Sequence, residues 1–323
     1  MKKTILFIAF SIFFLACREK EIEYELPFEG EKLVVIGILN PDEPINVKVT
    51  HTWTPTGIIP KNTFVDNATV NVLEDGKLKE QLVLEKEGNY ISIKGLKPLL
   101  GHKYLVEVFS SKYSKVISEQ VQIPENKAKF TFQQIADIDY KYNRDTPKDQ
   151  INVTLEDDLS KRSYYAISFN LYGDKSSNGN LYNRGSVFYL NDDGKVASNK
   201  ECSFNQTIYK DKNTISENVR VLANQCFTNS KNTFSFIVEK AYYNGFQNNK
   251  TIYKKVENPT LNIYQFDKGY FEYLKLKDQP DGLFERAFTE PHTTYTNIKG
   301  GYGIIGAVTK KSELLNMTCK ICQ

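Results

Sequence analysis

The sequence LVVIGIL, Leu33 to Leu39, opens a series of short apolar runs that continues to Ile123. Apolar and polar residues alternate in several of these runs, as expected for antiparallel strands with one buried face. Turn residues such as Asp75-Gly76 and Lys97-Pro98 separate them. We expect strands at Leu33–Leu39, Ile45–Thr50, Ala68–Glu74, Gln81–Leu84, Tyr90–Lys94, Tyr104–Ser110 and Lys115–Ile123.

Seven strands within about 90 residues are typical of an immunoglobulin-like β-sandwich. Pro124 ends the series, and residues 125–129 have the composition of a linker. The sequence therefore predicts a first sandwich domain over residues 31–124.

The remaining residues, 130–323, are also rich in strand-like runs, but the spacing of the runs is less regular. A helix is predicted at Lys268–Lys277, because Asp267 can cap its start, Phe266 and Phe271 lie at staple spacing, and Pro280 follows its end. Tyr270, Tyr273 and Leu274 would then face the sheet. We expect the strands at Phe130–Tyr140, Ile151–Leu155, Tyr164–Tyr172, Ser186–Leu190, Asn232–Lys240 and Leu261–Phe266.

The predicted fold class is therefore all-β, with a second, loop-rich β-sandwich domain over residues 130–323 that carries one short helix. Asn, Ser, Lys and Gly are frequent between Gly173 and Ser230, which indicates long loops. Binding functions often concentrate in such loops.

The amino terminus, MKKTILFIAFSIFFLAC, has the pattern of an export signal. Lys2 and Lys3 precede an apolar run of about a dozen residues, which is too short to span a bilayer. Ala16 supplies the small residue before Cys17, as in bacterial lipoproteins, whose cysteine is acylated after cleavage. We predict a signal peptide at residues 1–16 and lipidation (palmitate or a related acyl chain) at Cys17; an ordinary secretory signal is the alternative.

Residues 17–30 are rich in charged side chains, and we predict that they form an acylated tether between the membrane and the first domain. The acid-rich stretch from Glu19 to Glu21 loosely resembles signals that direct lipoproteins to the outer face of the outer membrane. The predicted location is the outer membrane, with the chain lipid-anchored and facing the cell surface.

Composition limits the classes of partner. Hydrophobic residues make up 40% and charged residues 25%, which is typical of a globular chain with a core. Without Lys2 and Lys3, the 42 basic residues become 40, against 39 acidic residues. A nearly neutral chain without a basic run is not expected to bind nucleic acid.

Four cysteines remain after Cys17, and an exported chain with an even number of cysteines favours disulfides. Three connectivities are open, and sequence proximity favours Cys202 with Cys226 and Cys319 with Cys322. A zinc site with four thiolates is the alternative, but two CxxC pairs are absent.

No catalytic constellation is visible, and we predict no cofactor and no metal. The glycines from Gly301 to Gly306 fit the letters GxGxxG, but a turn and bulge before a last strand explains them better than a nucleotide site. Asp137, Asp139, Asn143 and Asp145 lack the glycine and closing glutamate of a calcium loop. His51, His102 and His292 fall in unrelated contexts, and Trp53 is expected to be buried over the sandwich edge rather than to serve as a ligand platform.

Several segments appear in an order that resembles the lipoprotein family called domain of unknown function 4249. They are Cys17, KLVVIGIL from Lys32, NATVNVLEDG from Asn67, SYYAISF from Ser163 and FTEPHTTYTNIKGGYGIIGAVT from Phe288. Members of that family are typically encoded beside TonB-dependent outer-membrane transporters. The resemblance implies an accessory role in nutrient capture, by binding of the transporter barrel or of a glycan or peptide ligand, and it carries over no catalytic residue.

Two other functions stay open from the sequence. One is a cell-surface hydrolase acting on glycan or peptide, which would need a pocket with converging ionisable groups. The other is an adhesin or envelope scaffold.

Overall fold

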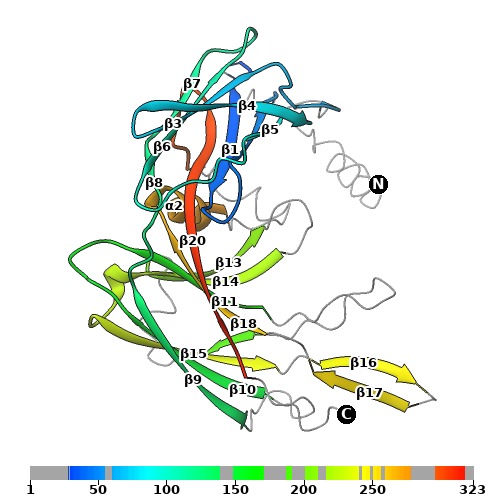
Figure 1. Cartoon of the computed structure of the whole chain (residues 1–323), viewed down its shortest axis with the longest axis vertical. Helices are drawn as coiled ribbons and strands as arrows, with labels where there is room; N and C mark the ends of the chain where they lie inside the picture. Colours follow the sequence, from blue (N-terminus) through cyan, green and yellow to red (C-terminus); the bar gives the residue numbers. More distant parts are fainter. Residues whose placement is uncertain are drawn as a thin grey trace, which may run out of the picture.

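The computed structural model describes residues 28, 30–54, 60–138, 148–170, 187–190, 201–209, 216–239, 242–247, 250–255, 259–277 and 295–316. Strands dominate, as the all-β prediction requires, and they form an upper and a lower half (Figure 1). The strands that the first 123 residues contribute are β1 (Leu33–Leu39), β2 (Asn46–His51), β3 (Thr69–Glu74), β4 (Lys77–Lys86), β5 (Asn89–Ile91), β6 (Lys103–Phe109), β7 (Val116–Ser118) and β8 (Val121–Gln122).

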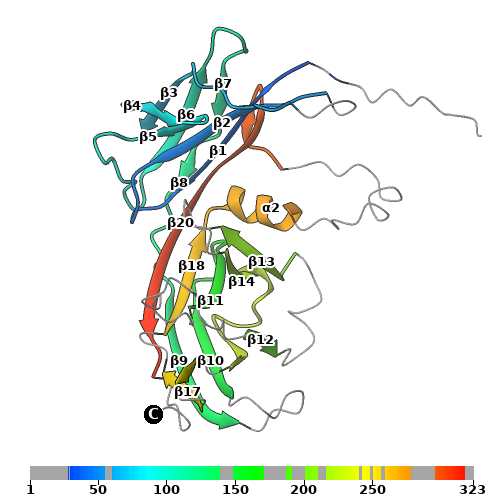
Figure 2. The same ribbon diagram turned by 90° about the vertical axis from the view of Figure 1, so that its right-hand side faces the viewer.

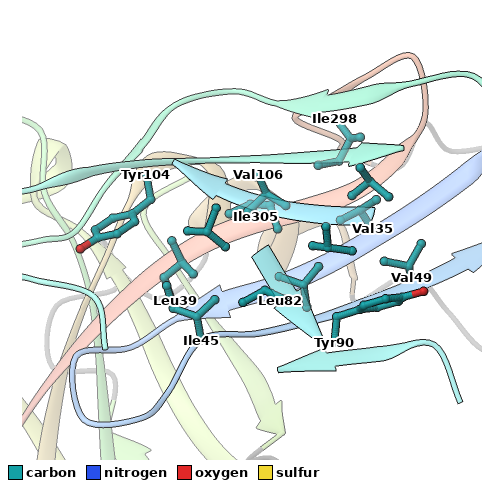
Figure 3. Close-up of a cluster of buried hydrophobic side chains, with 14 of the residues drawn as sticks. Val35, Leu39, Ile45, Val49, Leu82, Tyr90, Tyr104, Val106, Ile298 and Ile305 are labelled. Atoms are coloured by element: carbon teal, nitrogen blue, oxygen red, sulfur yellow. The ribbon is translucent and has the colours of Figure 1, made fainter. Parts of the chain in front are cut away.

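The upper half is a sandwich whose two layers are continuous through β4, in the order β1-β2-β5-β4-β3-β6-β7. Alternate residues of each strand point inward, so that Val70 and Val72 of β3 are fully buried while their neighbours are not. Most of the predicted strands are confirmed, but the single strand expected at Lys115–Ile123 is divided into β7 and β8, and the strand expected at Tyr90–Lys94 ends at Ile91. Figure 3 shows the resulting core, with Tyr90 and Tyr104 at its two ends and aliphatic side chains between them.

Two strands from the end of the chain complete this sandwich. β19 (Ile298–Lys299) pairs with β7, and β20 (Tyr302–Leu314) pairs in parallel with β1, from Val34 opposite Tyr302 to Leu39 opposite Ala307. Ile298 and Ile305 are buried in the same core as Val35 (Figure 3). The core that the sequence assigned to residues 31–124 therefore includes side chains from the predicted second domain, because apolar alternation identifies a strand but not its partner.

β20 is long enough to serve both halves (Figure 2). Beyond Ala307 it leaves β1 and pairs antiparallel with β18 (Thr260–Phe266), from Val308 opposite Phe266 to Leu314 opposite Thr260. A single strand of 13 residues thus joins the upper and lower sheets into one path.

The glycines of β20 are required by close packing. Gly303 has φ +111°, and a Cβ built there would lie 2.0 Å from the carbonyl oxygen of Val35 on β1. A Cβ at Gly306 would lie 2.8 Å from the Cβ of Tyr270. The interpretation of Gly301 to Gly306 as part of a turn and last strand is confirmed.

The lower half is a second sandwich. One layer continues the long sheet in the order β13-β14-β11-β18-β20, and the other has the order β12-β15-β10-β9. A core that includes Tyr165, Phe236 and Leu261 fills the space between the layers. These strands are β9 (Lys129–Ile138), β10 (Lys148–Glu156), β11 (Tyr164–Asn170), β12 (Val187–Leu190), β13 (Ser203–Tyr209), β14 (Ser216–Ala223) and β15 (Lys231–Glu239).

Four strands of this half were not predicted. β13 and β14 form a hairpin within the stretch from Gly173 to Ser230 that we expected to consist of loops around the SVFYL run. β16 (Tyr242–Gln247) and β17 (Lys250–Lys255) form a separate hairpin. Their many Asn, Ser and Lys residues weaken the apolar alternation on which strand prediction depends.

The predicted helix is confirmed as α2 (Lys268–Lys277). Tyr270, Phe271 and Leu274 are buried against the outer face of the lower sheet, and Tyr273 is partly buried there. The ring of Phe271 stacks on Tyr164 of β11 with 4.3 Å between ring centroids. α2 therefore covers the lower sheet just below the upper half (Figure 2).

Replacement of Gly303 by alanine tests the close approach of β20 to β1. Gly303→Ala should lower the free energy of unfolding by about 3 kcal/mol or more, because it adds both a strained φ and a backbone clash. Gly76→Ala is the matched control: its φ is +80°, but nothing lies within 4 Å of the added Cβ. It should cost only about 1 kcal/mol. Urea unfolding measures both, and equal costs would contradict the packing described.

Candidate functional site

A cleft of about 710 Å³ opens at the junction of the two halves. The upper half supplies the segment from Glu119 to Glu125, which includes β8. The lower half supplies two segments, Lys161 to Tyr164 at the start of β11 and Gln265 to Gly269 from the end of β18 to the start of α2. Tyr295 and Asn297, which precede β19, complete the lining.

Asp267 fixes the turn at the base of the cleft. Its carboxylate accepts hydrogen bonds from the backbone N–H of Gly269 (2.7 Å) and of Tyr270 (3.3 Å), which caps α2 as predicted. The same carboxylate accepts a hydrogen bond from the backbone N–H of Ala307 (2.6 Å), and the N–H of Asp267 donates to the carbonyl of Ala307 (3.0 Å). The start of the helix is thereby bound to β20.

Asn297 fixes the part of the cleft lining that precedes β19. The side-chain amide of this buried residue donates to the carbonyl of Ile305 (2.8 Å), and its oxygen accepts from the N–H of Ile305 (3.0 Å). Its backbone carbonyl accepts from the N–H of Glu119 on the upper half (2.7 Å). Asn297 and Asp267 thus anchor two parts of the cleft to the same strand.

The turn before β11 is held by Asn224, which is buried. Its side-chain oxygen accepts from the N–H of Ser163 (2.9 Å), and its amide donates to Asp157 Oδ2 (2.8 Å) and to the carbonyl of Lys161 (2.7 Å). Lys161 and Arg162 are therefore carried on a fixed turn.

The cleft presents charges of both signs. Lys161, Arg162 and Lys268 supply positive charge, whereas Glu119, Glu125 and Asp267 supply negative charge. The buried rings of Tyr164 and Phe266 lie behind them. This lining suits a polar ligand that carries charged or hydrogen-bonding groups.

One side-chain atom in the lining also has an unused hydrogen-bonding capacity. Gln265 Oε1 is buried and has no hydrogen-bond partner within the described residues, and neither does Thr309 Oγ1, whose residue pairs with Gln265 across the strands. A buried polar atom without a partner costs about 1–3 kcal/mol.

Burial raises the pKa of Asp267 to about 6, against the hydrogen bonds from Ala307, Gly269 and Tyr270, which lower it. Burial also raises the pKa of the Tyr295 hydroxyl above its ordinary value.

Of the predicted crosslinks, Cys202 and Cys226 are joined by a disulfide with 5.5 Å between their Cα atoms, so this pairing is confirmed. It connects the start of β13 to the end of β14 and does not line the cleft. The predicted lipidation site Cys17 and the cysteines Cys319 and Cys322 lie outside the described residues.

The histidines within the described residues do not meet at a site. His51 contacts the carbonyl of Thr52 through Nδ1 (2.9 Å) and stacks on Tyr113, and the Nδ1 atom of His102 lies 2.8 Å from Asp75 Oδ2. Neither lines the cleft. His292, like Asp139, Asn143 and Asp145 of the weak calcium pattern, lies outside the described residues, within which no group of His, Cys, Asp and Glu could hold a metal ion.

The expected burial of Trp53 is wrong, because 42% of its surface is exposed. Thr52 is still held to β1 through two hydrogen bonds with Lys32, but β2 ends at His51 and Trp53 lies beyond the last paired residue. Its position in the sequence directly after a strand could not show which way the loop turns.

A comparison with protein families identifies the family of this chain. The model of one family, described as Domain of unknown function (DUF4249), matches residues 19–313. The chain belongs to the DUF4249 family. The expected resemblance is thus confirmed, and the matched range includes both halves and the whole lining of the cleft.

A search of curated proteins found no match for this DUF4249 chain. Across the part of the chain that the structure describes, no helix has the length and apolar character needed to cross a membrane.

Sequence reasoning found Asp267 as a helix cap but missed its place in the cleft. It also missed Arg162, Gln265 and Tyr295, which come from three separated segments. The sequence showed that Pro124 ends a strand series, but it could not show which segments of the second half lie beside that residue.

Replacement of Asp267 by asparagine tests its buried carboxyl. Because the folded state holds this proton up to about pH 6 and an unfolded aspartate releases it near about pH 4, the stabilising contribution should fall as pH rises from about 4 to about 6 and stay constant above. Asp267→Asn, which keeps a capping oxygen, should lack this decline. Urea unfolding at several pH values measures the difference between the two proteins, and parallel curves would contradict the assignment.

Proposed function

We propose that this DUF4249 chain is an outer-membrane lipoprotein, acylated at Cys17, that assists a TonB-dependent transporter by binding the transporter's ligand. The cleft at the junction is the observation that carries the proposal. It is large enough for a small ligand and is lined by residues from both halves.

The mixed charge of the lining supports a short peptide rather than a neutral glycan as the ligand. A peptide brings both an ammonium and a carboxylate group, together with backbone donors and acceptors. Arg162 suits a carboxylate because its guanidinium can donate two parallel hydrogen bonds. Glu119 suits an ammonium group.

The anchor and the cleft would act together. Acyl chains hold the protein at the membrane, since each buried methylene contributes about 0.8 kcal/mol. A ligand bound in the cleft is then concentrated beside a barrel in the same membrane.

Affinity purification from detergent-solubilised membranes tests the partnership. The acylated chain should recover a TonB-dependent barrel, and Cys17→Ser, which cannot be acylated, should recover several-fold less because both partners no longer share a membrane. Repeated recovery of the lipoprotein without any barrel would contradict the proposal.

Peptides released from the purified protein, identified by mass spectrometry, test the cleft. Arg162→Gln should reduce the bound peptide about tenfold, since a charge-assisted pair contributes about 1.5–3 kcal/mol. Lys77→Gln, an exposed change on β4 outside the cleft, is the control. Equal recovery from both variants would show that the cleft does not hold the peptide.

A further inference from the structure

The end of the upper half where β1 begins carries exposed aromatic side chains. Trp53 and Tyr302 are 42% and 41% exposed, respectively. Trp53 is the single tryptophan of the chain. Such large apolar groups on the surface indicate a contact when they gather in one place.

Hydrogen bonds and a cation–π contact hold two of these side chains beside the start of β1. The N–H of Lys32 donates to Thr52 Oγ1 (2.9 Å), and the N–H of Thr52 donates to the carbonyl of Lys32 (2.9 Å), which places Trp53 next to this strand. The Lys32 ammonium lies 5.6 Å from the centre of the Tyr302 ring. We call this group, with the loop from Phe109 to Lys115, the aromatic tip.

Lysines surround the aromatic tip. The Lys112 ammonium lies 5.0 Å from the Tyr113 ring centre and pairs with Glu31 (2.8 Å). The Lys115 ammonium lies 4.5 Å from the Phe109 ring centre and pairs with Glu107 (3.1 Å). Lys299, which precedes Gly300 beside the Lys115 carbonyl, is also exposed.

The aromatic tip is the described part of the molecule closest along the chain to the predicted acylation site. Cys17 precedes Gly30 by 13 residues. This length reaches at most about 45 Å when extended and about 20 Å as a flexible chain. An acylated Cys17 therefore keeps the aromatic tip near the membrane surface.

We infer that the aromatic tip rests on the lipid surface that holds the acyl chains, with Trp53 at the level of the headgroups. Tryptophan and tyrosine favour this interface because their rings are apolar with one polar edge, and lysines favour phosphate-bearing headgroups. The inference rests on the lipid anchor proposed above.

The contact would also orient the molecule. β1 and β20 run in parallel from the aromatic tip toward the lower half, as Figure 2 shows. With the aromatic tip on the membrane, the cleft and the lower sandwich point away from the lipid. The ligand site would then face the aqueous side, where a barrel's extracellular loops lie.

The emission of Trp53 tests the inference directly, because no other tryptophan contributes. The acylated full chain is placed in vesicles of phosphatidylethanolamine and phosphatidylglycerol, with or without brominated acyl chains. Flotation with the vesicles first shows that the anchor holds. Bromine should then quench the emission about twofold, and the emission should shift to the blue relative to Cys17→Ser in buffer.

A matched pair of variants tests the lysines. Lys112→Gln with Lys115→Gln should reduce the quenching, whereas Lys77→Gln with Lys103→Gln, at the opposite end of the upper sandwich, should not. Loss of surface pairs such as Lys112 with Glu31 has little effect on folding, so each protein should stay native.

Flotation with unchanged emission would overturn the membrane contact and leave the anchor standing, and it would point to a protein partner for the aromatic tip. Failure of the acylated chain to float would overturn the anchor and the contact together.

Discussion

The backbone approach between β20 and β1 is the constraint on which the rest of the structure depends. Gly303 lies so close to the carbonyl oxygen of Val35 that no side chain fits between the strands. Parallel neighbours need a crossover connection, and here that connection is nearly the whole chain, from Leu39 to Tyr302. The upper sandwich is therefore complete only when the carboxyl-terminal segment has returned to it.

The cleft depends on the same strand. Asp267 bonds to the backbone of Ala307, and Asn297 bonds to the backbone of Ile305, in each case as both donor and acceptor. These bonds attach the start of α2 and the segment before β19 to β20 on the part of the strand that crosses between the halves. A ligand site at a junction usually changes shape when its two sides move. Here one strand restrains both sides.

Asp267 places a titratable group in the turn that joins β18 to α2. The Asp267 carboxyl is placed where burial opposes its ionisation, yet backbone N–H groups offset much of that cost. Asp267 therefore caps α2 and also bonds the start of this helix to β20. Its hydrogen-bond partners at Gly269, Tyr270 and Ala307 are all backbone groups.

The sequence predicted the local elements well. Alternation placed strands such as β1 and β3 within a residue or two, and Asp267 correctly predicted the start of α2. The partner of β20 could not be predicted, because the pattern IIGAVT identifies a buried strand and is silent on its neighbour. The same limit applies to the cleft, since Arg162 and Tyr295 are far apart in sequence and each looks like an ordinary loop residue.

The exposure of Trp53 was also not predicted from the sequence. Trp53 follows a strand that buries Val47 and Val49 on one face, and a lone tryptophan is more often covered than exposed. Only the course of the loop after His51 decides the matter, and that course depends on the bonds between Lys32 and Thr52. The composition predicted a globular chain with a core, whereas contacts between distant segments determine which side chains are exposed.

Native-state hydrogen exchange of β20 tests the central claim, that this strand makes the two halves one cooperative unit. Amides that pair with β1, up to Ala307, and amides that pair with β18, from Val308 onward, should exchange with the same free energy of opening. A markedly lower value in one segment than in the other would show that the halves open separately, and it would contradict the account.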